Sequence, residues 1–153
     1  MTLVHFTLAE AIEDRPPVPQ RGGNKPDGLW VSDESAEDSW SSWNEQESYV
    51  DLSVRQAFAV TVREDRILVL ADVPALDAFT AEYGTDLHRY KDDDAWAMDW
   101  ARVAERYDGI LITPYQWERR LTAMWYYTWD CASGCIWNMD AIATIEQIER
   151  VKS

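Results

Sequence analysis

Short apolar runs recur along the chain, several with strict alternation, and they predict a protein rich in β-strands. In the run TLVHFTL at 2–8, a period of two places Leu3, His5 and Thr7 on one face of a strand and the intervening residues on the other. Further strands are predicted at 28–33, 50–54, 57–62, 67–70, 108–115 and 133–138. The charged stretch at 63–66 favours a hairpin between the strands at 57–62 and 67–70.

Apolar residues at three- and four-residue spacing predict helices between these strands. One or two helical turns are expected over 9–13, and a helix over 35–47, where Ser35 with Asp38 resembles a capping arrangement. A second helix is predicted over 74–83, ending at Gly84. The acidic turn at 92–94 is expected to begin a longer helix with a buried stripe of Trp96, Trp100, Val103 and Tyr107.

Two segments near the end of the chain fit more than one kind of element. The segments 117–129 and 139–151 suit either a helix or a strand, and the pattern does not decide between them. Helices are interspersed with strands but without a regular βαβ alternation. We therefore predict one α+β domain over 1–153, with a mixed or antiparallel central sheet flanked by helices, rather than a doubly wound parallel sheet.

The segment 14–28 interrupts this pattern with four prolines and three glycines in fifteen residues and is predicted to be a loop. Loops of this length are often functional. It contains a small basic island of Arg15, Arg21 and Lys25. Between Lys25 and Arg55 the chain has no basic residue but eight acidic ones.

The net charge is −14, from 28 acidic and 14 basic residues, and argues against non-specific binding of nucleic acid, which depends on cations that neutralise phosphates. No apolar run is long enough to span a membrane and the N-terminus lacks a signal-peptide pattern, so a cytoplasmic protein without a membrane partner is expected. The two cysteines, Cys131 and Cys135, are expected to be reduced thiols rather than a disulfide. A metal site is not expected, because His5 and His88 lie far from them in sequence.

Common motifs for binding nucleotides by a Gly-rich loop, for serine hydrolysis and for zinc proteolysis do not occur in the sequence. Two strand faces remain as candidate sites. His5 and Thr7 share one face of the first strand, while Trp30 and Ser32 share one face of the second and offer an aromatic surface beside a hydroxyl. The alternative is that His5 is a structural histidine and that Trp30 belongs to the core.

The opening LVHFTLAEAI resembles the ADP-ribosyltransferase superfamily, particularly its RNA 2′-phosphotransferase-like and DNA-modifying toxin branches, which begin with a strand carrying His-x-Thr. The resemblance covers about the first 33 residues. It implies an ADP-ribosyltransferase-like fold and NAD as a substrate, with His5 and Thr7 holding NAD and Trp30 stacking on nicotinamide beside Ser32. It also implies that Arg15, Arg21 and Lys25 meet the pyrophosphate, an anion that basic side chains favour.

The third motif of that superfamily is a glutamate on a later strand, and no residue of this chain is identified as its counterpart. Glu146 and Glu149 are candidates if the C-terminal segment is a strand. Asp130 is the other candidate and is favoured here, because its apolar surroundings make a carboxylate costly unless it is used or paired.

We consider three functions, of which the first and third are implied by the resemblance and the second by the acidic charge pattern. The first is an enzyme that transfers ADP-ribose from NAD to a macromolecular or nucleotide target, or cleaves NAD. The second is an acidic inhibitor, as small phage proteins can be, that mimics nucleic acid and binds a basic protein. The third is a catalytically inactive nucleotide-binding module on the transferase-like scaffold. The target macromolecule stays unknown in each case.

Overall fold

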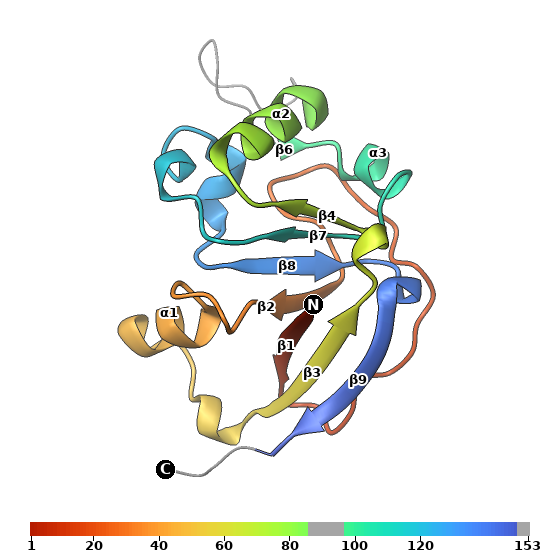
Figure 1. Ribbon diagram of the computed structural model, residues 1–153, viewed down its shortest axis with the longest axis vertical. Coiled ribbons are helices and arrows are strands. Elements are labelled where there is room, and N and C mark those ends of the chain that lie inside the picture. The colour runs from red at the N-terminus through yellow and green to blue at the C-terminus, as the bar shows by residue number, and fades with distance from the viewer. Residues whose placement is uncertain (86–96, 150–153) are drawn as a thin grey trace.

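The computed structural model describes residues 1–85 and 97–149, and a seven-stranded sheet is its central feature (Figure 1). Within these residues, one neighbouring pair of the sheet, β4 with β7, is parallel, and the other five pairs are antiparallel. The predicted α+β class with a mixed sheet is therefore confirmed. In spatial order the strands are β4 (Ile67–Leu70), β7 (Gly109–Ile112), β8 (Ser133–Ile136), β2 (Leu29–Ser32), β1 (Thr2–Thr7), β3 (Gln56–Val62) and β9 (Ile142–Ile148).

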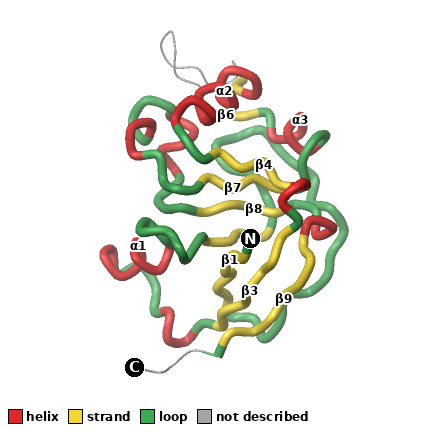
Figure 2. Tube along the Cα trace, viewed as in Figure 1, coloured by secondary structure: helices red, strands yellow, loops and turns green. Residues whose placement is uncertain are grey.

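Helical elements are short, and they lie at the ends and on one side of the sheet (Figure 2). The α-helices are α1 (Trp40–Glu47), α2 (Val73–Tyr83) and α3 (Trp100–Ala104). A two-stranded ribbon joins β5 (Gly84–Thr85) to β6 (Ala97–Met98). Single 3₁₀ turns occupy Leu52–Val54, Glu64–Arg66, Trp117–Arg119, Met124–Thr128 and Met139–Ala141. No helix of the described part of the chain combines the length and apolarity needed to cross a membrane.

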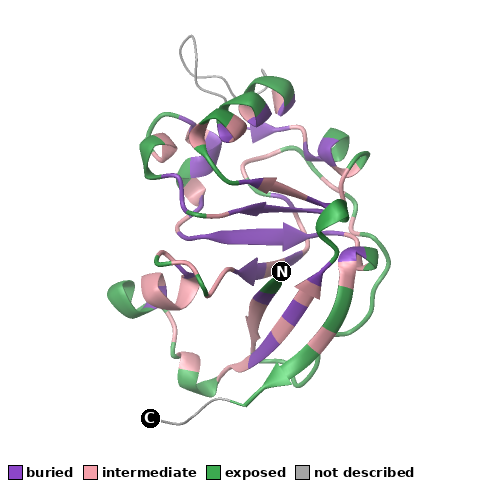
Figure 3. Ribbon diagram, in the orientation of Figure 1, coloured by how far each residue is buried: buried purple, intermediate pink, exposed green. Residues whose placement is uncertain are grey.

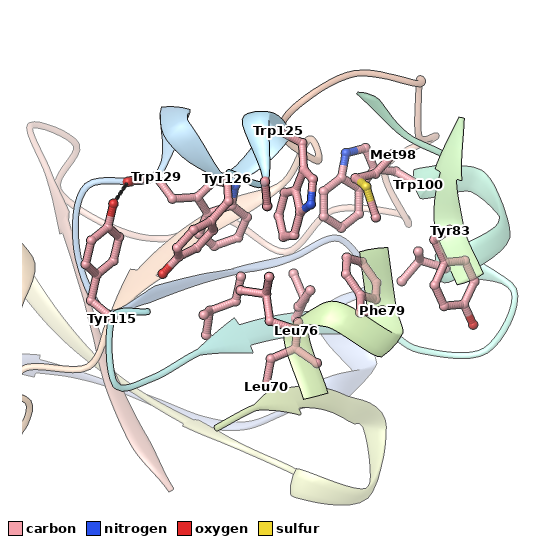
Figure 4. Packing of buried hydrophobic residues seen from close by; sticks show 14 of the residues in the cluster. Leu70, Leu76, Phe79, Tyr83, Met98, Trp100, Tyr115, Trp125, Tyr126 and Trp129 are labelled. Carbon is pink, nitrogen blue, oxygen red and sulfur yellow. Dashed lines mark hydrogen bonds between the residues drawn. The ribbon is translucent and has the colours of Figure 1, made fainter. Parts of the chain in front are cut away.

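The central strands are buried on both faces, and the colours of Figure 3 show this for β7 and β8, whereas β9 is largely exposed. Alternation along β7 divides the core into two clusters: Ile110 and Ile112 belong to one, and Leu111 to the other. The first cluster is rich in aromatic rings and fills the space between the sheet, α2, α3 and the turn Met124–Thr128 (Figure 4). Trp30 packs against this aromatic cluster, so its strand face is the one that faces the helices.

Two strand predictions are wrong, one because of a local side-chain contact and the other because of pairing between distant segments. The segment 50–54 contains a 3₁₀ turn, in which the Asp51 carboxylate accepts hydrogen bonds from the backbone N–H and hydroxyl of Ser53. The predicted hairpin does not form, since β3 pairs with β1 and β9 while β4 pairs with β7. The C-terminal segment, which fits either element, is the strand β9.

Several helix predictions also change. The first helix begins at Trp40 with Ser39 as its N-cap, because Ser35 instead donates its hydroxyl to the neighbouring Asp33. The segment 9–13 is not helical, and 117–129 is neither helix nor strand but two 3₁₀ turns. The start of the predicted long helix lies outside the described residues. Within its described part the prediction is wrong at Ala97–Met98, which form the strand β6, whereas Trp100–Ala104 is helical with Trp100 and Val103 buried as expected. Tyr107, the last residue of the predicted stripe, lies beyond the helix and is half-buried.

The predicted loop 14–28 is confirmed, and it is fixed to the domain at several points. Its Val18 N–H donates to the carbonyl of Trp137 at 2.8 Å, and the Trp100 indole donates to the carbonyl of Gly23 at 3.0 Å. At its end, Gly28 has a positive φ of 156°, and a Cβ there would lie 2.4 Å from the carbonyl oxygen of Ile136. This glycine lets the loop enter β2 directly against β8, which places Lys25 beside the face of Trp30.

Candidate functional site

A pocket of about 320 Å³ opens on the face of the sheet where β1 and β2 meet. Its wall comes from four parts of the chain: residues 4–6 of β1, residues 25–32, α1 with Arg55, and the segment 129–133 that leads into β8. Five of the predicted site residues line it together: His5, Lys25, Trp30, Ser32 and Asp130.

Aromatic rings make up two sides of this pocket. Phe6 and Trp40 pack against each other with ring centroids 5.2 Å apart. Trp30 meets the edge of Trp129 at 5.0 Å, and the Lys25 ammonium lies 5.4 Å from the Trp30 ring. A planar ligand ring entering this space would therefore find aromatic side chains in the wall, with the Lys25 ammonium beside one of them.

His5 reaches the pocket through an opening between two strands. β1 and β2 are paired at Val4 and Ser32. Beyond that pair, the carbonyl oxygen of Trp30 is bound by the His5 imidazole instead of a backbone N–H of β1. Its Nδ1 lies 2.6 Å from the carbonyl oxygen of Trp30, which can only accept, so Nδ1 carries the proton and Nε2 is the acceptor. Burial lowers the pKa of His5, and the nearby Arg15 charge adds to this effect while the Trp30 carbonyl opposes it. His5 is therefore neutral at pH 7.

Ser32 is buried, and its hydroxyl has structural partners. The hydroxyl donates to Glu34 at 2.6 Å and accepts from the backbone N–H of Trp40 at 3.0 Å, while Glu34 also accepts from Ser41. This chain of contacts fixes the start of α1, and hence the Trp40 ring, against the pocket. Ser32 thus shapes the wall, with one lone pair of its oxygen left for a ligand.

Asp130 supplies the carboxylate of the pocket. It lies three residues before β8, which pairs directly with β2, so the fold brings it to the same place as Trp30. It pairs with Arg120, whose guanidinium lies 3.9 Å from the carboxylate, and both side chains are more than one-third exposed. The pair is loose and wet, so this carboxylate remains available to a ligand.

Five of the predicted site residues lie outside the pocket wall. Thr7 accepts a hydrogen bond from the backbone N–H of Ala9 at 3.1 Å, which turns the chain out of β1. Arg21 is exposed and paired with Asp27 at 3.3 Å, and Arg15 is exposed, close enough to His5 to influence its pKa. Glu146 lies on β9, opposite Ala59 and two strands beyond the pocket, with its side chain exposed. The neighbouring Glu149 is exposed too, just beyond β9.

Other wall residues were missed by the sequence interpretation. Trp129, Cys131 and Ser133 surround Asp130 in sequence, while Arg55 and Trp40 come from segments whose position depends on long-range pairing. The count of nine tryptophans was a signal for such a wall, but it does not say which of them line it. Burial raises the pKa of the Cys131 thiol to about 11, so this thiol stays protonated and is a poor nucleophile.

The chemistry that this arrangement allows is recognition of a flat, partly polar ligand beside one carboxylate. The pocket has aromatic faces, a neutral imidazole, cations from Lys25 and Arg55, and the carboxylate of Asp130. Across the described residues, no three His, Cys, Asp or Glu side chains are grouped closely enough to hold a metal ion. Both cysteines are free and buried. Comparisons of this chain with protein-family models, curated proteins and solved structures found no match.

Proposed function

We propose that the pocket binds NAD and that the protein is an ADP-ribosyltransferase-like enzyme, which transfers ADP-ribose to a target or cleaves NAD. The observation that carries the proposal is the convergence of His5, Trp30 and Asp130 on one pocket from segments far apart in sequence. The same proposal includes an ADP-ribosyltransferase-like arrangement of the sheet. It is supported by β1 and β2 lying side by side, with β8 next to β2.

In the proposed reaction the bond between C1′ of a ribose and the nitrogen of nicotinamide breaks. Its electron pair leaves with nicotinamide, which becomes neutral, and positive charge develops on the ribose. The Asp130 carboxylate would stabilise that charge, as a carboxylate does in glycoside hydrolysis. A nucleophile of the target, or water, then forms the new bond at C1′ and loses its proton.

The other pocket residues would bind and orient. Trp30 offers an aromatic face to the nicotinamide ring, and the protonated Nδ1 of His5 fixes the imidazole so that Nε2 can accept from a ribose hydroxyl. Lys25 is the member of the basic island that reaches the pocket wall, and we assign the pyrophosphate to it and Arg55. Arg15 and Arg21 have no such place in the wall.

The test compares NAD binding and nicotinamide release for the wild-type protein, Trp30→Ala and Trp43→Ala. Trp43 is a matched control, because it lies on α1 and packs against Tyr49 rather than in the pocket wall. Stacking of a base on an aromatic ring contributes about 1–3 kcal/mol, so Trp30→Ala should weaken binding by roughly 5- to 150-fold. Absence of NAD binding by the wild-type protein, or equal losses in the two variants, would refute the proposal.

A second candidate is the catalytically inactive nucleotide-binding module. It is favoured by the residue at the carboxylate position, since Asp130 is one methylene shorter than the glutamate that the resemblance implies. Tight binding of NAD by the wild-type protein, without release of nicotinamide, would select this function over the enzyme.

The acidic-mimic function has less support from the contacts. Five of the eight carboxylates between residues 27 and 51 accept hydrogen bonds from other groups of the chain. They stabilise local structure and are less available to a basic partner. Their partners include the Thr113 hydroxyl, at 2.7 Å from Asp33, and the Trp117 indole, at 2.9 Å from Asp38. The five are Asp27, Asp33, Glu34, Asp38 and Asp51.

A further inference from the structure

Three large apolar side chains are exposed close together on the segment that precedes the pocket. The exposed fraction is 56% for Trp117, 71% for Leu121 and 47% for Tyr127. The segment itself is firmly held, because Trp125 and Tyr126 between them are fully buried. We give the name aromatic surface to the exposed side chains of Trp117, Leu121 and Tyr127, together with the half-buried Arg120 that contacts both rings.

Arg120 shows what the two exposed rings can hold. Its guanidinium carbon lies 5.8 Å from the centroid of the Trp117 ring and 5.7 Å from that of Tyr127. Both distances are within the range of a cation–π contact. The two rings thus already contact one cation, that of Arg120. Each ring is also exposed enough to contact a second cation that belongs to another molecule.

The charges around the aromatic surface are mainly negative. Asp38 accepts a hydrogen bond from the indole N–H of Trp117, and Glu118 is exposed in the same turn. Asp130 lies beside Arg120. Within the segment 117–127 the basic groups are Arg120 itself and Arg119, which is neutralised by two hydrogen bonds to Asp77 at 2.7 and 2.9 Å. With the net charge of −14, the field at this surface attracts cations and repels phosphates.

We propose that the aromatic surface is a docking site for a basic, arginine- or lysine-containing segment of a partner protein. Exposed aromatic rings with adjacent carboxylates bind such a segment by two means: cation–π contacts with the rings and attraction to the carboxylates. A nucleic-acid strand would use the rings but meet repulsion from the surrounding charge. Because Asp130 also lines the pocket, a docked segment lies at the pocket mouth. The proposal holds whether or not the pocket binds NAD.

The experiment uses a fluorescein-labelled peptide of alternating arginine and glycine, with binding to the full-length protein followed by fluorescence anisotropy. The wild-type protein should bind it, and more weakly as the salt concentration rises. The double variant Trp117→Ala/Tyr127→Ala keeps the net charge and should bind about tenfold more weakly, since it removes two exposed cation–π contacts. Tyr49→Ala is the control, because Tyr49 is 66% exposed within the acidic stretch but outside the aromatic surface.

Two further measurements keep the outcome decisive. Leu121→Arg adds a charge at an exposed position without removing any buried group, so it should fold normally and weaken binding by repulsion. A labelled oligothymidine is tested in parallel. The proposal is overturned if the peptide does not bind, if Tyr49→Ala loses as much affinity as the double variant, or if the oligonucleotide binds to the aromatic surface more tightly than the peptide.

Discussion

Replacing Asp130 with asparagine separates a catalytic role of this carboxylate from a structural one. The substitution keeps the size and shape of the side chain and removes its charge. If Asp130 stabilises positive charge on ribose, nicotinamide release should fall by about 10²–10³-fold, the usual loss when one preorganised electrostatic contact to a transition state is removed. NAD binding should change less, because the positive charge lies on the nicotinamide ring in the ground state and moves onto the ribose only in the transition state.

The cost of this substitution to stability follows from the geometry of the ion pair. Asp130 and Arg120 are 3.9 Å apart, with 37% and 36% of their side chains exposed. Exposed pairs of this kind contribute about 0–1 kcal/mol to the free energy of unfolding. For a chain of this length that corresponds to a fall in Tm of no more than about 4 °C. A large loss of activity with so small a loss of stability would point to chemistry rather than to misfolding.

The assay is single-turnover release of nicotinamide, measured alongside thermal unfolding and NAD binding for each variant. Glu146→Gln is the matched control, since Glu146 was the other predicted catalytic residue and lies exposed on the edge strand β9. Asp130→Asn with wild-type turnover would refute the proposed role of Asp130. If Glu146→Gln alone lost turnover, the catalytic carboxylate would lie on β9, outside the pocket, and the proposed site would be wrong.

Three further predictions concern the scaffold of the site. Burial lowers the pKa of His5 below its usual 6.5, so the unfolded protein binds a proton at this residue more readily than the folded protein. The stability that the neutral imidazole contributes is therefore complete above about pH 6.5 and is lost as the pH falls. The free energy of unfolding in urea should depend less on pH for His5→Asn than for the wild-type protein. A Cβ at Gly134 would lie 2.3 Å from the Ile110 carbonyl oxygen, so Gly134→Ala should lower the free energy of unfolding by about 1–3 kcal/mol in denaturant titrations. Burial raises the pKa of Cys131, so native protein should react with a thiol reagent far more slowly than unfolded protein.

Local pattern was enough to predict the segments of the site that are short and strongly periodic. The strands at 2–8 and 28–33 form β1 and β2, and the shared face of Trp30 and Ser32 follows from alternation alone. Asp130 lies in the pocket wall, but the cost of burying a carboxylate among aromatic residues does not explain its place, since 37% of its side chain is exposed and it pairs with Arg120. The predictions of the two strands and of their shared face depend on interactions within a few residues, which a single sequence contains.

Two predictions failed because of short-range side-chain contacts, those of Asp51 with Ser53 and of Asp33 with Ser35. Most other failures depend on contacts between distant segments. The strand at 67–70 looks like the second half of a hairpin, yet it pairs in parallel with β7, more than forty residues later. The segment 117–129 has no regular period, because its rings are placed by neighbours rather than by a helix: the Trp125 indole donates to Thr80, and the Tyr126 hydroxyl accepts from the N–H of Gln116. Such contacts fix geometry without leaving a repeat in the sequence.

The position of His5 shows why this pocket exists at all. Strict alternation would place His5 on the face of Leu3, which belongs to the cluster on the far side of the sheet from Trp30. It reaches the pocket because the pairing of β1 with β2 stops at Val4 and Ser32. Continued pairing would set Phe6 against Trp30 and close the surface, and the Trp30 carbonyl would be bound by backbone instead of imidazole. The missing backbone pairing between β1 and β2 therefore leaves room for the pocket and also allows His5 to reach its wall.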